Sequence, residues 1–143
     1  MRIADILRSK GSTVATVTET TTVSGLLTEL AVHNIGAMVV VGPDGLVGIV
    51  SERDVVRKLH EHGPDLLGRR VGDIMSSVLV SCTPEDHIDD LSALMTNNRV
   101  RHVPVLENGR LVGIVSIGDV VKNRMEELQV EHEHLHAYIT QGG

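Results

Sequence analysis

Aromatic residues are almost absent from this sequence. Among 143 residues, Tyr138 is the one aromatic side chain, and Phe and Trp do not occur. A surface on which nucleic-acid bases stack needs several aromatic side chains. Lys and Arg form no long run and the formal net charge is −6, whereas a duplex-binding protein presents a basic stripe. We therefore expect no nucleic-acid partner.

Cysteine and long apolar runs are also scarce. Cys82 is the single cysteine, so no internal disulfide can form, as is usual in a reducing compartment. The longest apolar run spans a few residues, far short of the roughly 20 that cross a bilayer. The N-terminus lacks the apolar segment of a secretory signal. We expect a soluble, cytoplasmic protein with no membrane partner.

The sequence shows no motif of a familiar enzyme class. A phosphate-binding loop, a dinucleotide-binding glycine motif and a zinc-protease motif are all missing. Cys82 has no basic neighbour in sequence and lies in a predicted strand, which suits a small buried side chain. The acidic pairs at 89–90 and 126–127 are typical of exposed helix surfaces. We therefore expect a protein that is not an enzyme.

An internal repeat is the strongest positive signal. Residues 46–56 return as 111–121, with LVGIVS and the following DVV identical in both copies. Residues 3–7 are echoed at 71–75. A unit present only twice cannot build a solenoid. We expect the two copies to pack against each other about a pseudo-twofold axis and to form one module.

Each copy is predicted to fold as βαββα, which gives an α/β (α+β) class. Turn residues at 42–45 and 107–110 separate apolar β-branched runs and predict two hairpins. The predicted first copy has strands at 14–17, 37–41 and 46–50 and helices at 23–31 and 51–60; the second has strands at 78–82, 102–106 and 111–115 and a helix opening at Pro84. The predicted boundaries are 1–62 for the first repeat, 63–70 for a linker, 71–122 for the second repeat and 123–143 for a C-terminal helical extension.

The repeated Ser-x-x-Asp carries the most specific chemistry. Ser51 and Ser116 each stand where a strand gives way to a helix, and a helix N-terminus attracts phosphate. Three residues later, the carboxylates of Asp54 and Asp119 can accept hydrogen bonds from ribose hydroxyls. The alternative is that each serine only caps its helix and each aspartate only favours the first turn. The identical spacing in both copies favours a ribonucleotide site.

The two predicted sites differ in charge. Arg53 precedes Asp54 and offers a cation to phosphate, whereas Gly118 precedes Asp119 and offers only backbone. Arg101 and His102 lead the strand that we expect to enter the second site. We therefore expect these two residues to compensate there for the missing arginine.

The C-terminal segment departs from the repeat. From Val121, the residues Met125, Leu128, His132, Leu135 and Ile139 follow at alternating spacings of four and three, and all but His132 are apolar, which predicts one helix with a coiled-coil-like seam. This seam would pack back on the module or pair with a second copy. His132 and His136 lie one turn apart, a spacing that can hold a metal ion, but no third fixed ligand is evident. A solvated polar face is the preferred interpretation.

Taken together, Gly48–Asp54, Gly113–Asp119 and Arg99–Val105 resemble the CBS domain pair, a regulatory module named after cystathionine β-synthase, and in particular its small stand-alone bacterial members. The resemblance implies adenine-nucleotide ligands (AMP, ATP or NAD(H)) in clefts between the repeats, and a homodimer. It also implies base neighbours and apolar walls in those clefts. The expected ligand-binding residues are Thr13, Ala15, Gly36, Ala37, Ile49, Ser51, Arg53, Asp54, Val80, Arg101, His102, Ile114, Ser116 and Asp119.

The expected function is thus a regulatory adenine-nucleotide sensor whose state an unknown protein target reads. Two alternatives remain open at this point. One is a constitutive dimeric scaffold with non-functional clefts. The other is metal binding through the C-terminal histidines.

Overall fold

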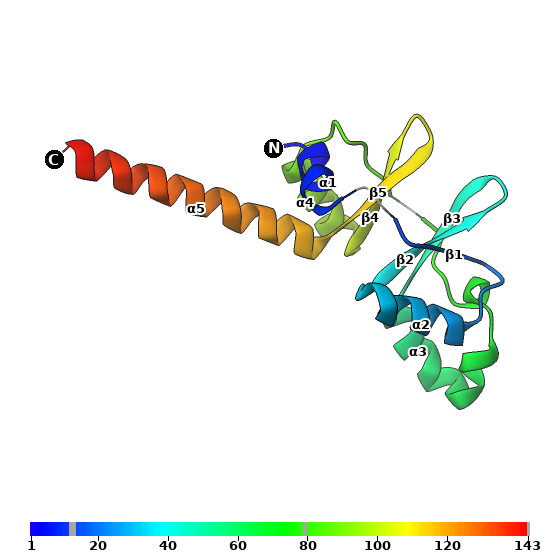
Figure 1. The fold of residues 1–143 in the computed structure, drawn as a ribbon. Helices are drawn as coiled ribbons and strands as arrows, with labels where there is room; N and C mark the ends of the chain where they lie inside the picture. Colours follow the sequence, from blue (N-terminus) through cyan, green and yellow to red (C-terminus); the bar gives the residue numbers. More distant parts are fainter. Residues whose placement is uncertain (12–13, 79, 143) are drawn as a thin grey trace.

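The computed structural model describes residues 1–11, 14–78 and 80–142. It has the predicted α+β fold (Figure 1). In chain order, the elements are α1 (Ile3–Lys10), β1 (Thr16–Thr18), α2 (Val23–His33), β2 (Ala37–Gly42), β3 (Gly45–Ser51), α3 (Glu52–His62), α4 (Ile88–Asn98), β4 (His102–Glu107), β5 (Arg110–Ser116) and α5 (Ile117–Gly142). The first half contains α2, α3 and a sheet of order β1-β2-β3, and the second contains α4 and the β4-β5 hairpin.

The hairpins and the first-half helices follow the sequence prediction closely. Thr22 caps α2, where its hydroxyl accepts a hydrogen bond from the Gly25 amide at 3.1 Å. Each hairpin contains one register shift, between Val40 and Val41 in the first half and between Val105 and Leu106 in the second. The irregularity recurs at equivalent positions, so the duplicated sequence specifies backbone detail as well as element order.

The predicted strand at 78–82 is wrong as a full strand. In the described part of that segment, Cys82 alone pairs with Val105, in the register that Val17 and Val40 have in β1-β2. Pro104 stands where the first half has Val39. Because proline has no N–H, it cannot donate a further bond to this ladder. Leu79 lies outside the described residues.

The predicted helix start at Pro84 is also wrong. Residues 83–86 form a turn in which Asp86 accepts a hydrogen bond from the Thr83 amide at 2.8 Å. α4 begins only at Ile88. Proline suits the turn because its φ is already fixed.

The leading segment of each repeat packs into the opposite half. Ile3, Ile6 and Leu7 of α1 are buried in the second-half core with residues of α4, β4 and β5. The equivalent Val71 and Ile74 are buried in the first-half core. The first-half core also contains Leu66, whose side chain is fully buried in a 3-10 helix at Gly63–Gly68. The predicted linker is therefore part of a core.

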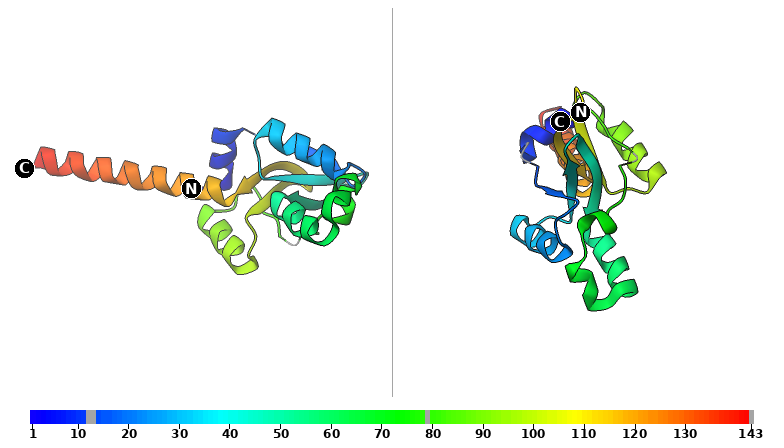
Figure 2. Two further views of the ribbon diagram at one scale, coloured as in Figure 1. Left: turned by 90° about the horizontal axis from the view of Figure 1, so that it is seen from below. Right: turned by 90° about the vertical axis from the view of Figure 1, so that its right-hand side faces the viewer.

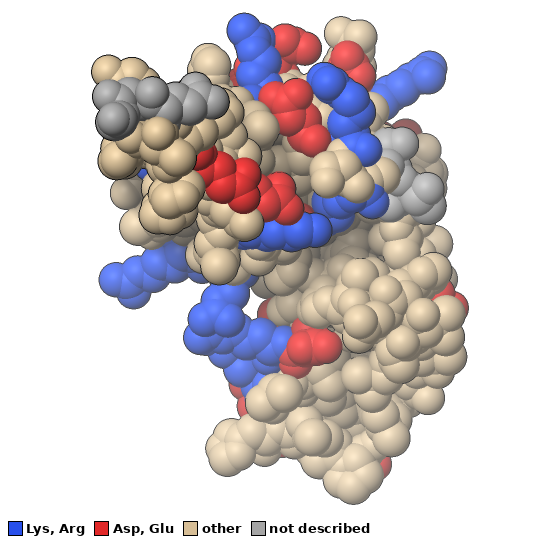
Figure 3. All heavy atoms as spheres, turned by 60° about the vertical axis from the view of Figure 1, so that its left-hand side comes forward, with Lys and Arg blue, Asp and Glu red and all other residues tan. Residues whose placement is uncertain are grey.

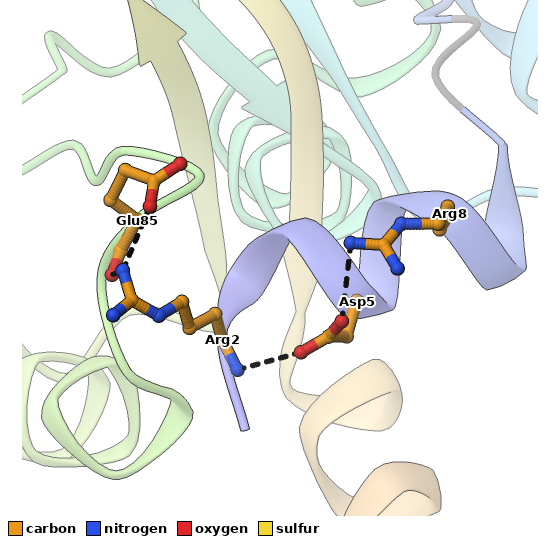
Figure 4. A network of polar contacts seen from close by, with 4 residues as sticks. All are labelled: Arg2, Asp5, Arg8 and Glu85. Carbon is orange, nitrogen blue, oxygen red and sulfur yellow. Dashed lines mark hydrogen bonds and ion pairs between the residues drawn. The ribbon is translucent and has the colours of Figure 1, made fainter.

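Polar contacts fix α1 on the second half (Figure 4). Arg2 pairs with Glu85 at 2.8 Å, and Asp5 accepts a hydrogen bond from the Arg2 amide at 3.0 Å. Arg8 pairs with the same Asp5 at 3.3 Å. The Ile3 amide also donates to the Asp86 carbonyl at 2.9 Å. Arg2 and Glu85 are exposed, so we assign most of the stabilisation to the buried apolar residues of α1.

A glycine in the last strand of each half, β3 or β5, makes room for the crossing segment. A Cβ added at Gly48 would lie 2.7 Å from the Ser76 carbonyl oxygen and 2.9 Å from the Met75 sulfur. A Cβ added at Gly113 would lie 2.5 Å from Leu7 Cδ2. Leu7 and Met75 are equivalent positions of the two repeats. The glycine of LVGIVS is therefore needed because another chain segment crosses it.

α5 extends away from the rest of the molecule, as Figures 1 and 2 both show. The predicted continuous helix is confirmed, but its distal part does not pack back on the module. Its apolar seam is exposed: Met125, Leu128, Leu135 and Ile139 are 54–65% accessible. Among the described residues, none of the helices combines the length and apolarity that a bilayer crossing requires.

The crossing predicts that alanine at either glycine lowers the stability of the protein, and that it lowers it more at Gly48 than at Gly113. We expect Gly48→Ala to lower the free energy of unfolding by about 1–3 kcal/mol, because the new methyl group meets a backbone carbonyl. Gly113→Ala should cost less, because the end of the Leu7 side chain can move. Denaturant unfolding followed by circular dichroism measures both values.

Gly68→Ala is the control, because a Cβ there meets no described atom within 4 Å. Equal stability of all three variants would contradict the crossing as the reason for the two glycines.

Candidate functional site

Two clefts lie between the halves, and each takes residues from both. The first cleft, of about 380 Å³, is lined by Gly36, Ile49, Ser51, Glu52, Arg53, Asp54, Arg57, Ser76, Ser77, Val78, Val80, Arg99, Val100, Arg101 and His102. The second cleft, of about 600 Å³, is lined by Lys10, Val14, Ala15, His33, Asn34, Ile35, Gly36, Ala37, His102, Ile114, Ser116 and Asp119. Both volumes fall within the usual range of ligand pockets, roughly 300–1,000 Å³.

A reciprocal capping box begins the helix at the first cleft. The Ser51 hydroxyl accepts a hydrogen bond from the Asp54 amide at 3.4 Å, and Asp54 Oδ2 accepts one from the Ser51 amide at 2.9 Å. The Glu52 amide donates to the Gly36 carbonyl at 3.0 Å. Of the four amides that start α3, the Arg53 N–H alone has no partner among the described residues. It is therefore available to an anion.

The helix at the second cleft starts in the same way. The Asp119 amide donates to the Ser116 hydroxyl at 3.2 Å, and Asp119 Oδ2 accepts from the Ser116 amide at 2.9 Å. The Ile117 amide donates to the Arg101 carbonyl at 2.8 Å, which leaves the Gly118 N–H without a partner in the described chain. A capping box by itself thus explains why an acid recurs three residues after each serine. The identical spacing is weaker evidence for a ligand than the sequence suggested.

Each aspartate nevertheless keeps one oxygen outside the cap. Within the described residues, the hydrogen bonds to Asp54 and Asp119 all reach Oδ2. Oδ1 of each carboxylate remains able to accept hydrogen bonds from a hydroxyl group. Capping and ligand binding are therefore compatible in the same residue.

Lys10 distinguishes the second cleft and was missed by sequence reasoning. Its Nζ lies 2.7 Å from Asp119 Oδ2 and 2.9 Å from the Ile114 carbonyl oxygen. Lys10 ends α1, which reaches this cleft because α1 packs on the second half. No local sequence signal connects a lysine at position 10 with an aspartate at 119.

The structure places the predicted site residues on the two clefts as follows. The first cleft holds Ile49, Ser51, Arg53, Asp54, Val80 and Arg101; the second holds Ala15, Ala37, Ile114, Ser116 and Asp119; both share Gly36 and His102. Thr13 lies outside the described residues. Each cleft thus combines the serine and aspartate of one half with strand-leading residues of the other.

The expected compensation by Arg101 in the second site is therefore wrong. Arg101 lines the first cleft, where Arg53 already lies, and not the second. His102 does line the second cleft, together with the first. The cation that the second cleft gains is Lys10.

Burial and neighbouring charges shift the pKa values of two cleft residues. Burial lowers the pKa of His102 below 6.5, and the positive charge of Lys10 adds to this effect. Burial alone would raise the pKa of Asp119, but hydrogen bonds from Lys10 and Ser116 outweigh it and lower the pKa below 3.8. At neutral pH, His102 is therefore uncharged and Asp119 is ionised.

Cys82 lies in the second-half core, away from both clefts. Burial, with a smaller effect of the Asp86 charge, raises the pKa of its thiol to about 12. Among the described residues, no group of three or more His, Cys, Asp or Glu side chains is placed to hold a metal ion.

The lowered pKa of His102 predicts a pH dependence of stability. Its pKa in the unfolded chain is near 6.5, so the unfolded state binds the proton more readily. We expect the free energy of unfolding to fall as pH drops below 6.5 and to level off, for this residue, below the folded-state pKa. His102→Gln should flatten this slope in denaturant titrations between pH 7.5 and 5, whereas His134→Gln, on exposed α5, should not. An unchanged slope in His102→Gln would contradict the assignment.

Comparisons with known proteins agree with this geometry. The model of the CBS domain matches residues 3–61 and again residues 71–126. The mitochondrial CBS domain-containing protein CBSX3 of Arabidopsis thaliana is 40% identical over 99% of this chain and 72% of its own length. The crystal structure of the CBS-domain protein ATU1752 from Agrobacterium tumefaciens superposes with a TM-score of 0.83 at 42% identity, covering 87% of this chain and 99% of that one.

A third similar structure was solved with a ligand. The CBS domain protein PAE2072 from Pyrobaculum aerophilum, complexed with AMP, has a TM-score of 0.73 at 29% identity and covers 83% of this chain and 89% of its own. The two matched segments coincide with the two sequence copies whose halves enclose the clefts. This chain belongs to the CBS-domain family, as a protein with a pair of CBS domains.

Proposed function

We propose that this protein is a regulatory, non-enzymatic module that binds adenine nucleotides such as AMP, ATP or NAD(H) in its two clefts. The observation that carries this proposal is the same in both clefts. In each cleft, the Oδ1 oxygen of the aspartate accepts no hydrogen bond from the described residues. The backbone N–H of the residue before it, at the start of the helix, also has no partner among them. The AMP complex of the similar protein PAE2072 supports the same ligand class.

Each cleft offers a separate group to each part of the nucleotide. The backbone N–H of Arg53 or Gly118 lies at the positive end of a helix dipole and donates a hydrogen bond to a phosphate oxygen. Oδ1 of Asp54 or Asp119 accepts hydrogen bonds from the ribose hydroxyls. Ile49 and Ile114 supply apolar walls for the adenine, with Val80 near the first and Ala15, Gly36 and Ala37 near the second. Thr13 remains a predicted base neighbour.

Regulation follows from the position of the clefts between the halves. A bound nucleotide contacts both halves and favours the arrangement in which both sets of contacts are made. The free energy by which a nucleotide shifts this equilibrium can be no larger than the difference in its binding free energy between the two arrangements. A protein target that contacts both halves, or α5, would detect this shift.

A homodimer held partly by α5 completes the proposal. The exposed stripe of Val121, Met125, Leu128, Leu135 and Ile139 follows a heptad pattern on a helix that leaves the module. Pairing with the same helix of a second copy would bury these side chains. A constitutive dimeric scaffold would share this interface but would not respond to nucleotide.

Removing both ribose acceptors tests the proposal. We expect Asp54→Asn/Asp119→Asn to weaken AMP and NAD⁺ binding by about tenfold or more, because a hydrogen bond to a charged group contributes roughly 1.5–3 kcal/mol. The asparagine oxygen can still accept from the serine amide, so the caps are retained. Isothermal titration calorimetry gives the dissociation constants.

Asp73→Asn is the matched control, because Asp73 accepts from the Arg70 amide at 3.3 Å in a similar turn that lines neither cleft. A thermal-shift series with AMP, ATP, NAD(H) and Zn²⁺ separates the alternatives. Stabilisation by no nucleotide would favour the scaffold, and stabilisation by Zn²⁺ alone would favour the metal-binding alternative.

The role of α5 is tested by charge within the stripe. Leu128→Glu/Leu135→Glu should convert the homodimer to a monomer or weaken it markedly, because charged side chains would face each other across the seam. His134→Glu, off the stripe, should leave the mass unchanged. Light scattering after size exclusion measures the mass, and a dimer that survives both substitutions would contradict the proposed interface.

A further inference from the structure

We propose that the two clefts take different ligands: the first takes an adenosine compound with at least two linked phosphates, and the second one with a single phosphate or none. This inference rests on the proposed function, since it assigns ligand classes to the same clefts. The difference in charge between the two clefts carries it.

Four arginines line the first cleft. Arg53 and Arg57 come from the first two turns of α3, one helical turn apart, and Arg99 and Arg101 come from the segment between α4 and β4. The two pairs thus approach the cleft from opposite halves. Figure 3 shows Lys and Arg side chains over the upper and middle parts of one face, with Asp and Glu among them in the upper part, whereas the lower part carries few charged groups.

These guanidinium groups are not neutralised by ion pairs. Within the described ranges, no Asp or Glu oxygen lies within 4.0 Å of any of the four. The acidic residues that line the same cleft are Glu52 and Asp54, and Oδ2 of Asp54 is held in the helix cap. Four cations and two carboxylates leave the first cleft with a formal charge of +2.

The second cleft carries no such excess. Among the described residues that line it, Lys10 is the one Lys or Arg, and its ammonium is paired with Asp119 at 2.7 Å. Both groups are partly buried, so solvent screens this pair less than an exposed one. His102 is uncharged at neutral pH because burial and Lys10 lower its pKa. The formal charge of the second cleft is therefore zero with both histidines neutral.

This difference selects ligands by their number of phosphates. Guanidinium groups bind phosphate oxygens in bidentate fashion, and a pyrophosphate link offers enough oxygens for two or more arginines. In the second cleft, a phosphate must compete with Asp119 for Lys10. Volume does not produce the difference, because the second cleft is the larger of the two. The duplicated chain thus holds one cleft suited to polyanions and one suited to less charged ligands.

Calorimetric titrations of the full chain with AMP, ADP, ATP and NAD⁺ test the assignment. ADP, ATP and NAD⁺ all contain adenosine with linked phosphates, whereas AMP has a single phosphate. Comparing ADP and ATP with NAD⁺ shows whether the first cleft prefers a terminal polyphosphate or a dinucleotide. We expect at least one of ADP, ATP and NAD⁺ to bind about tenfold or more tightly than AMP at the first cleft. Arg53→Gln/Arg57→Gln should weaken that ligand by about tenfold or more and leave AMP within about threefold.

Lys58→Gln is the matched control, because it removes a cation from α3 that does not line the cleft. The inference is overturned if AMP binds at the first cleft as tightly as the other three ligands. It is also overturned if the double variant weakens AMP equally, or if Lys58→Gln has the same effect as the double variant. In those cases nucleotide binding itself stands; binding of none of the four ligands would overturn the proposed function as well.

Discussion

The exchange of leading segments is the constraint on which the rest of the structure depends. Ile3, Ile6 and Leu7 complete the second-half core, and Val71 and Ile74 complete the first. Neither half therefore has a full set of buried apolar side chains without residues from the other copy. The same exchange carries Lys10 to Asp119 and lays residues 75–76 across Gly48. The clefts exist because the two halves are held together in this way.

The exchange also has a kinetic cost. Contacts between α1 and β5 join residues about as far apart as the module allows, and long-range contacts of this kind slow folding. Because the two cores share segments, unfolding of one half exposes apolar surface of the other. This favours a single cooperative transition over separate melting of two domains.

Local sequence signals predicted the parts of the fold that depend on local interactions. The turns at 42–45 and 107–110 and the cap at Ser51 are set by neighbours along the chain, and the structure has them where they were expected. The errors have local physical causes. Pro104 shortens a ladder that pairs a full strand in the first copy, and Pro84 occupies a turn before α4, which begins at Ile88 just as α2 begins at the equivalent Val23.

The candidate site was predictable in composition but not in arrangement. The sequence alone identified Ser51, Asp54, Ser116 and Asp119, since one spacing occurs twice. It could not show which cleft Arg101 lines, so this arginine was assigned to the second cleft although it lines the first. No sequence signal pointed to Lys10, because its partner Asp119 lies at the other end of the module. Charged residues that only tertiary packing brings together show no regular spacing in the sequence.

The buried thiol of Cys82 has a practical consequence. With a pKa of about 12 and a place beside Val105 in the second-half core, it is protonated and shielded at physiological pH. An alkylating reagent can reach it only when that core opens. No other cysteine competes for the reagent. The rate at which Cys82 is modified therefore measures how often the second-half core opens, with no label or engineered residue required.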